Sequence, residues 1–148
     1  MHFTDFTDYS LRVLIYLHMK GDGKSTVKQV AEYYNISQNH LVKVVHSLGL
    51  KGYIKSEKGK GGGIRLSKPA SEIKIGAVIK DMEPHFNLVT CFSTTNRPCR
   101  VEPVCALKGV LGAAMQSFFD VVDQYSLEDA VNKPCKVGIS EQEIKVDA

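Results

Sequence analysis

The chain has 148 residues, 43% hydrophobic and 24% charged, which is typical of a soluble globular protein with one medium domain or a small domain plus an appendage. It contains no run of about 18 uninterrupted apolar residues and no secretory pattern at its start, so we expect neither a membrane span nor export. In the cytoplasmic protein that this predicts, four cysteines favour metal or redox chemistry over structural disulfides.

The charge is distributed unevenly along the chain. Residues 1–68 contain 11 Lys and Arg against 5 Asp and Glu, whereas residues 69–148 contain 8 against 11. A basic first part joined to an acidic second part indicates that the first part contacts a polyanion. A chance asymmetry of solvated faces is the plainer alternative.

Three helices are expected in the first third of the chain, at 7–20, 27–34 and about 38–50. Thr7, Thr26 and Ser37 are the residues that we expect to cap them, and apolar residues recur at helical spacing in each. The second and third helices are separated by a short turn that contains Ile36. This spacing is typical of a helix-turn-helix, although an ordinary helical hairpin has the same pattern.

A β-hairpin is predicted directly after the third helix. Segments 53–56 and 64–67 alternate in polarity and flank a basic, glycine-rich turn. This order of elements is that of a winged helix-turn-helix. Lys58, Lys60 and Arg65 would bring positive charge to DNA, and the glycines would let the backbone approach a phosphate or the minor groove closely. A turn without a binding role is the alternative.

The third helix carries polar residues off its apolar face. Gln38 and Asn39 can each form two hydrogen bonds with adenine, and Lys43 can bind a guanine edge or a phosphate. His46 follows on the same side. These four residues are our candidates for base contacts, because the first turns of a recognition helix enter the major groove. The alternative is a polar face that contacts only solvent.

The second half of the chain is expected to be mostly helical. We predict a short helix over 73–82, an irregular loop over 85–103, a long helix over about 104–125, a final turn to residue 131 and a loose polar tail. The apolar stripe of the long helix is wider than one packing partner needs, which predicts a dimer interface. The alternative is that the stripe packs only on the head of the same chain, by which we mean its winged helix-turn-helix. No nucleophile–base pair or phosphate loop is recognisable, so we do not expect an enzyme.

Three cysteines, Cys91, Cys99 and Cys105, lie within 15 residues in and beside the predicted loop. Clustered thiolates bind soft metals or iron–sulfur clusters, but the spacing matches neither zinc nor ferredoxin patterns. A fourth ligand could be an exogenous molecule or one of several side chains: Asp8, His85, Glu102 or Cys135. Thiols that respond to oxidants without any cluster remain an alternative.

Several motifs together resemble the Rrf-type winged-helix regulators over most of the chain, to about residue 131. They are Phe6 to Tyr9, Asn39 to Lys43, the Gly59 to Leu66 wing and the three-cysteine loop. The resemblance implies a homodimer with a 2Fe-2S or 4Fe-4S cluster. It implies Cys91, Cys99 and Cys105 as ligands, with Asp8 of the partner subunit completing the set.

Within this family the chain is most similar to the nitric-oxide-sensing repressors, with Lys108 where the iron–sulfur-status regulators have a histidine. We therefore expect a nitric-oxide-responsive repressor that binds an inverted-repeat operator as a homodimer and releases it when the cluster is nitrosylated or lost. An iron–sulfur-status regulator and a cluster-free redox or metal regulator are the alternatives. The expected parts are a winged helix-turn-helix (1–70), a short helix with the cluster loop (71–103), a dimerisation helix (104–131) and a tail (132–148).

Overall fold

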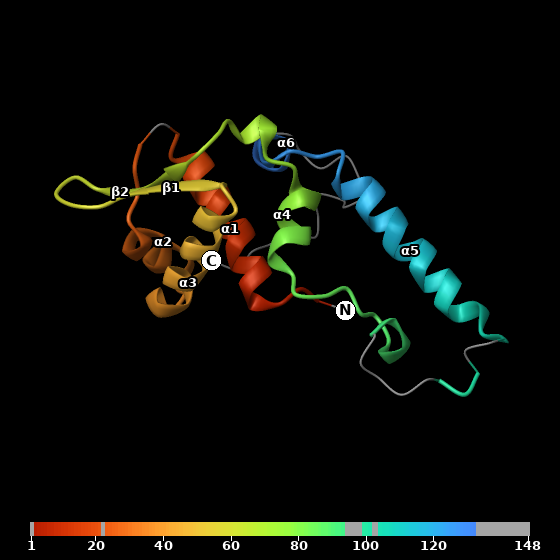
Figure 1. Ribbon diagram of the computed structural model, residues 1–148. Helices are drawn as coiled ribbons and strands as arrows, with labels where there is room; N and C mark the ends of the chain where they lie inside the picture. Colours follow the sequence, from red (N-terminus) through yellow and green to blue (C-terminus); the bar gives the residue numbers. More distant parts are fainter. Residues whose placement is uncertain (1, 22, 94–98, 102–103, 133–148) are drawn as a thin grey trace, which may run out of the picture.

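The computed structural model describes residues 2–21, 23–93, 99–101 and 104–132 (Figure 1). These residues form a mostly α-helical fold with one two-stranded antiparallel hairpin, which confirms the predicted fold class. Two short 3-10 helices are labelled η. In chain order the elements are α1 (Asp5–Met19), α2 (Val27–Tyr34), α3 (Gln38–Leu50), β1 (Ile54–Glu57), β2 (Gly63–Leu66), η1 (Ala70–Glu72), α4 (Ile75–Met82), η2 (Thr90–Phe92), α5 (Ala106–Val122) and α6 (Leu127–Asn132).

One hydrophobic core holds the first half of the chain together. α1 packs against α3, α4 and α6, and α3 packs against α2 and β1, so that their apolar faces meet. Leu127 on α6 is fully buried in the same core, so the end of the described chain closes over its beginning. The fully buried aliphatic residues are Val13, Leu14, Leu17, Val30, Leu41, Val44, Leu48, Ile73, Val78 and Leu127.

The helix-turn-helix forms as predicted. Thr26 caps α2 in a capping box, because its Oγ1 accepts from the N–H of Gln29 while Gln29 Oε1 accepts from the N–H of Thr26. Asn35 ends α2 with φ of 53°, a left-handed conformation that asparagine tolerates. Ser37 stands at the N-cap of α3, but its side chain makes no capping hydrogen bond.

The start of α1 differs from the prediction. The helix begins at Asp5, because Thr4 rather than Thr7 is its N-cap, and Thr4 Oγ1 accepts from the N–H of Thr7 at 3.4 Å. Thr7 is instead a wholly buried helix residue that donates to Glu83 Oε2 at 2.6 Å. The prediction that Thr7 caps the helix was wrong, and its hydroxyl ties α1 to the end of α4.

The wing is a regular hairpin with an additional bridge. β1 pairs with β2 in the register Ile54 to Leu66 and Lys55 to Arg65, and Ser25 forms an isolated antiparallel bridge with Ile64. A Cβ on Gly63 would lie 2.8 Å from the carbonyl oxygen of Ser25, so this position requires glycine. The bridge attaches the wing to the segment before α2, and the turn signals of the sequence do not reveal it.

Beyond the head, α5 contacts α4 and extends away from the rest of the molecule (Figure 1). It spans Ala106–Val122 and is shorter than the predicted 104–125. At the junction, Lys80 Nζ lies 2.6 Å from Asp123 Oδ2, and a Cβ on Gly76 would lie 1.9 Å from Asp123 Oδ1. α5 is therefore positioned through its C-terminal end, while its N-terminal end carries the cysteine loop.

The last described element confirms the predicted final turn. Ser126 caps α6, because its Oγ accepts from the N–H of Asp129 while Asp129 Oδ2 accepts from the N–H of Ser126. Within the described part of the chain, every helix is too short or too polar to cross a membrane. Of the predicted tail (132–148), Asn132 belongs to α6, and the rest, with Cys135, lies outside the described residues.

Candidate functional site

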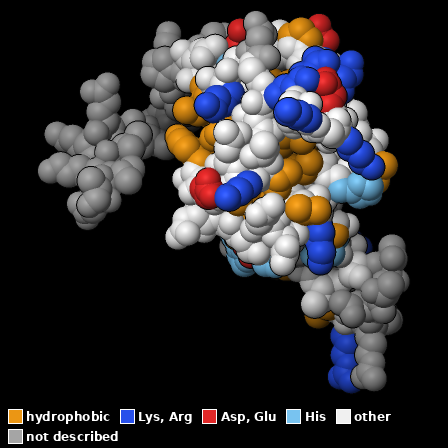
Figure 2. Space-filling model, turned by 90° about the vertical axis from the view of Figure 1, so that its left-hand side faces the viewer, with side chains coloured by type: hydrophobic (Ala, Val, Ile, Leu, Met, Phe, Trp, Pro, Cys, Tyr) orange, Lys and Arg blue, Asp and Glu red, His pale blue; other side chains and the backbone are white. Residues whose placement is uncertain are grey.

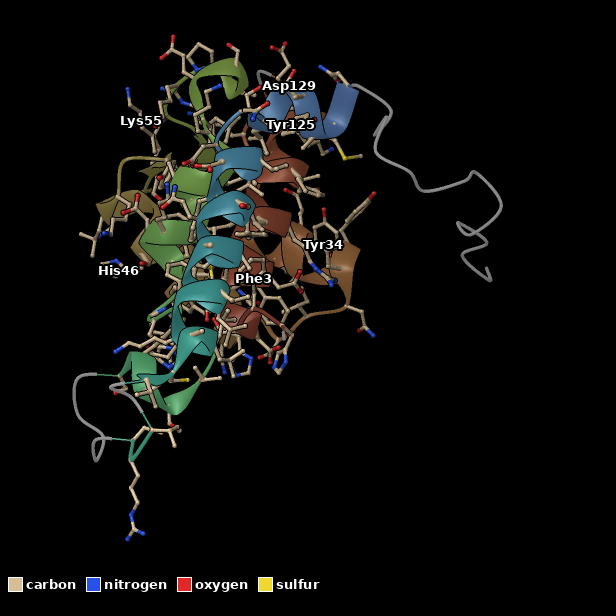
Figure 3. All side chains as sticks on the ribbon, turned by 90° about the vertical axis from the view of Figure 1, so that its right-hand side faces the viewer. Phe3, Tyr34, His46, Lys55, Tyr125 and Asp129 are labelled. Carbon is tan, nitrogen blue, oxygen red and sulfur yellow. The ribbon has the colours of Figure 1, made fainter. Side chains whose placement is uncertain are left out.

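The outer face of α3 is the first part of the candidate DNA interface. All four residues predicted to contact bases are exposed: Gln38, Asn39, Lys43 and His46. They lie opposite the buried face of the helix, because buried positions at helical spacing pack into the core. Figure 3 shows His46 and Lys55, from α3 and β1, toward the same edge of the molecule. The first turns of α3 therefore present hydrogen-bonding groups and a positive charge to a partner.

The wing tip is the second part of this interface. Lys58 and Lys60 are exposed in a turn where Gly59 and Gly61 have φ of 96° and 80°. These left-handed conformations favour glycine, and they leave the backbone of the tip bare of side chains at both positions. The wing projects from the head as a narrow loop (Figure 1), with lysines on a backbone that can approach a phosphate closely.

Arg65, which we expected to contact DNA, is paired with an acidic residue of the wing. Its Nε lies 3.3 Å from Glu57 Oε1, and Lys24 pairs with the other oxygen of the same carboxylate. The hydrogen bond from Lys24 is the main cause that lowers the pKa of Glu57, and the bond from Arg65 adds to it. Figure 2 shows Lys and Arg side chains gathered around acidic ones on the face from which the wing projects. Glu57 is a residue of this interface that sequence reasoning missed.

The cysteines lie far from this face, at the free end of α5. Cys91 lies in η2 and is half-buried, Cys99 is exposed, and Cys105 is the half-buried N-cap residue of α5. All three are free thiols. The donor chemistry of three thiols fits an iron–sulfur cluster, and the positive end of the α5 dipole favours anionic ligands beside Cys105.

The described residues do not bring a complete metal site together. Among them, which leave out 94–98 and 102–103, no three His, Cys, Asp or Glu side chains converge on one point. Glu102, a predicted candidate for the fourth ligand, lies outside the described residues, and His85 lines a cavity at the end of α4. The chain by itself therefore supplies the thiols without gathering them.

Asp8 is half-buried on α1, and its carboxylate is paired with a neighbouring side chain. Its Oδ2 forms an ion pair of 2.9 Å with Arg12, one helical turn further on. The guanidinium of Arg12 also lies 5.8 Å from the ring centroid of Tyr34 on α2. Asp8 is thus connected to the helix-turn-helix through Arg12.

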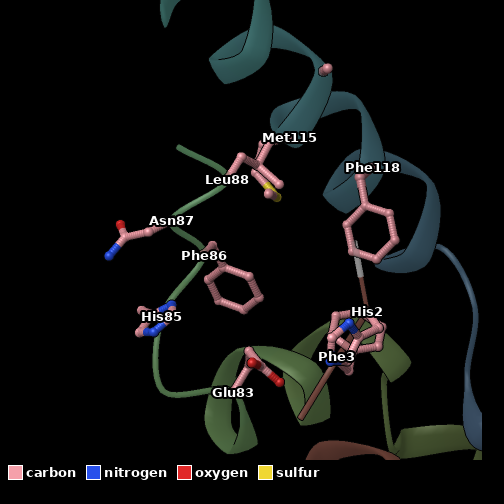
Figure 4. A pocket seen from close by; sticks show the side chains of 10 residues that line it. His2, Phe3, Glu83, His85, Phe86, Asn87, Leu88, Met115 and Phe118 are labelled. Carbon is pink, nitrogen blue, oxygen red and sulfur yellow. The ribbon is translucent and has the colours of Figure 1, made fainter. Parts of the chain in front are cut away.

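A cavity of about 330 Å³ lies between the first residues of the chain, the segment after α4 and α5 (Figure 4). Its walls are mainly apolar, and Phe86 from the segment after α4 packs edge-on against Phe119 of α5. The carboxylate of Glu83 stands at its edge and accepts hydrogen bonds from Thr4 and Thr7. The residues around the cavity are His2, Phe3, Glu83, His85, Phe86, Asn87, Leu88, Ala114, Met115 and Phe118.

The outer side of α5 and its flanks expose several large apolar side chains: Val104, Leu107, Val110, Val121 and Tyr125. Phe119 is the buried residue of α5, and Leu111, Met115 and Phe118 are partly buried. The side chains of Leu107, Val110 and Val121 are more than half exposed in a single chain.

Comparison with known proteins agrees with this arrangement. The Rrf2 family model, described as an iron-dependent transcriptional regulator, matches residues 3–133. The HTH-type transcriptional regulator NsrR of Bacillus subtilis (strain 168) is 47% identical over 132 residues, which cover 88% of this chain and 90% of that protein. The NsrR of Halalkalibacterium halodurans is 51% identical over 130 residues, with 87% and 89% covered.

Solved structures share the fold. CymR, the global cysteine regulator of B. subtilis, superposes with a TM-score of 0.71 at 25% identity, over 88% of this chain and 96% of that chain. The oxidized form of Staphylococcus aureus CymR gives a TM-score of 0.71 at 27% identity, over 90% and 98%. IscR of T. potens gives 0.71 at 20% identity, over 95% and 93%, which is a likeness of fold.

Proposed function

The chain belongs to the Rrf2 family of transcriptional regulators, and from that premise we propose that it is a homodimeric repressor that responds to nitric oxide through an iron–sulfur cluster. Regulators of this family bind DNA and are not enzymes, in agreement with the sequence prediction. The relatives named NsrR support the choice of repressor within the family. A cytoplasmic location goes with this role, because the operator is there.

The observation that carries the proposal is the exposed polar face of α3 beside a basic wing. Gln38, Asn39, Lys43 and His46 would enter the major groove, and Lys58 and Lys60 would reach the adjacent backbone or minor groove. A two-fold dimer repeats this surface, so the operator would be an inverted repeat whose half-sites lie in successive major grooves. Arg65 would contact phosphate only after leaving Glu57.

The exposed apolar side chains of α5 support the homodimer. Leu107, Val110 and Val121 recur on one side of the helix, and the described part of a single chain leaves each of them more than half exposed. An apolar stripe of this kind on a helix that projects from its head is most simply buried against a second copy, as in a two-fold interface. The spacing of the two heads would then depend on how α5 is held.

Cys91, Cys99 and Cys105 would hold the cluster, of the 2Fe-2S or 4Fe-4S type, and Asp8 of the partner subunit would be its fourth ligand. When bound, the cluster supplies iron atoms with which nitric oxide reacts. Asp8 would leave Arg12 to take this role, since the two are paired in the single chain. The half-buried thiols of Cys91 and Cys105 would be drawn together in the process.

The proposed coupling between the thiols and DNA affinity acts through α4 and α5. Cys91 belongs to the segment that leaves α4, and Cys105 begins α5, so that joining their thiols fixes the N-terminal end of α5 relative to α4. Separating them would release α5 and change the spacing of the two recognition helices. A hundredfold fall in DNA affinity corresponds to about 2.7 kcal/mol of coupling, which is ordinary for allostery.

A second candidate is a cluster-free regulator that senses oxidants through its thiols. It is favoured by the three free thiols, which do not converge among the described residues, and by the exposure of Cys99. Anaerobic purification separates the two candidates. A brown protein with visible absorbance supports the cluster, and a colourless one with a full thiol titre supports the second candidate.

The direct test combines this spectrum with DNA binding. Full-length protein reconstituted without air should bind an operator selected from random duplexes, and nitric oxide should weaken binding about a hundredfold, as the coupling above requires. Cys99→Ser should lose both the visible absorbance and tight binding, whereas the control Cys135→Ser should keep both. A Cys99→Ser dimer that binds tightly and still responds to nitric oxide would contradict the proposal.

A further inference from the structure

Two aliphatic side chains of α3 are exposed, Val42 and Leu50, and Val42 is the one that stands among the polar residues predicted to contact bases. Val42 is 50% exposed, and it is not one of the buried residues of the hydrophobic core. At 3.6 residues per turn, Val42 lies one turn beyond Gln38 and one turn before His46, with Asn39 on its other side. The candidate base-contacting surface is therefore not uniformly polar, and it has an apolar spot near its centre.

The position of Val42 decides what this spot can contact. It lies in the second turn of α3, at the border of the buried face that Leu41, Val44 and Val45 form, and half of its surface is exposed beside Asn39 and His46. In a recognition helix, this outward part of the first turns faces the floor of the major groove. Val42 is also outside α5, whose exposed apolar residues support the dimer, so a second copy of the chain does not explain it.

We propose that Val42 recognises the 5-methyl group of a thymine in the operator. The inference rests on the proposed DNA-binding function and names a base that this site reads. Among the groups that base pairs present in the major groove, the thymine methyl is the apolar one. A β-branched side chain offers two methyl groups on a stiff stem, which makes a compact surface for one methyl without a large loss of rotamer freedom.

The neighbours of Val42 suit the same base pair. Gln38 and Asn39 can each bind adenine through two hydrogen bonds, and adenine pairs with thymine. A cytosine at the contacted position would place its amino donor against Val42, which cannot accept a hydrogen bond. The three side chains together would therefore prefer A·T pairs within each half-site.

The test removes a single methyl from DNA. With the operator selected by full-length wild-type protein, each thymine of a half-site is replaced in turn by uracil, symmetrically in both half-sites, and Kd is measured by fluorescence anisotropy. At one position uracil should weaken wild-type binding about fourfold for each half-site, the change that about 0.8 kcal/mol for one buried methyl group makes. The symmetric substitution should then cost about fifteenfold.

Two variants assign this loss to Val42. Val42→Ala should bind the thymine and uracil operators with equal affinity, and it should fold normally because alanine is a good residue for an exposed helix position. The control Gln38→Ala should bind both operators more weakly and keep the difference between them. Circular dichroism on each variant checks that α3 has formed.

Tight wild-type binding with no thymine position sensitive to uracil would overturn this inference and leave the DNA-binding proposal intact. Val42→Ala with the wild-type difference between thymine and uracil would also overturn it. A protein that selected no sequence from the random duplexes would overturn both the DNA-binding proposal and this inference.

Discussion

The phenol of Tyr53 donates a hydrogen bond of 2.6 Å to Asp81 Oδ2. This bond joins the residue before β1 to α4. Lys51 Nζ, at the end of α3, lies 3.0 Å from the other oxygen of the same carboxylate. Asp81 therefore holds the end of α3 and the start of the wing to α4, which leads into the cysteine segment. This carboxylate is one physical connection between the two candidate sites.

Stability should depend on pH through Asp81. The hydrogen bond from Tyr53 is the main cause that lowers the pKa of this carboxyl, and Lys51 adds to it, while burial and this bond raise the pKa of Tyr53. A lowered carboxyl pKa means that the unfolded state binds more protons, so this stability is present above the ordinary Asp pKa of about 3.9 and is lost below it.

Tyr53→Phe should therefore lower the free energy of unfolding by about 1.5 kcal/mol at pH 7, the lower end of the values for hydrogen bonds to charged groups, because the Asp81 side chain is partly exposed to solvent. The difference from wild type should shrink as the pH falls from about 3.9 through the lowered pKa of Asp81, because the carboxyl becomes protonated in the folded protein over that range. Urea unfolding at a series of pH values measures this. A difference that stays constant down to the lowest pH would exclude the role assigned to Asp81.

Glu57 should limit the affinity for DNA. It pairs with both Lys24 and Arg65, and Glu57→Gln would weaken both pairs and remove a negative charge from the wing. We expect tighter binding at low salt and a steeper fall of log K with log salt, by about 0.9 for each additional phosphate contact. Glu72→Gln, outside the wing, is the control of equal charge. An unchanged salt slope would show that Arg65 and Lys24 do not reach phosphate.

A charge on the exposed side of α5 should separate the proposed dimer. Val110→Lys puts an ammonium group on the apolar side of the helix, where burial of an unpaired charge is costly. Sedimentation should show a folded monomer, and operator binding should fall with it. Gln116→Lys adds the same charge to the opposite side of α5 and should leave both unchanged. A Val110→Lys protein that stayed dimeric would place the interface elsewhere.

Local sequence patterns correctly predicted most of the helices and the hairpin of the head. The capping residue Thr26, the turn at Asn35 and the alternating segments around the glycine-rich turn each depend on residues close in sequence, and the helices and hairpin formed there. Thr7 shows where such signals fail. It has the residue type of a cap, but Thr4 takes the position and the buried Thr7 hydroxyl bonds to Glu83, 76 residues away.

The sequence by itself determined which segments are helices and strands, which side of α3 is buried, and which residue types could bind DNA or a cluster. Periodicity and turn preferences decide these, because they act over a few residues. Only the tertiary structure decided that Arg65 is paired with Glu57, that Ser25 bridges to the wing and that the Thr7 hydroxyl bonds to Glu83. These depend on distances between segments that core packing sets, and no local pattern encodes them.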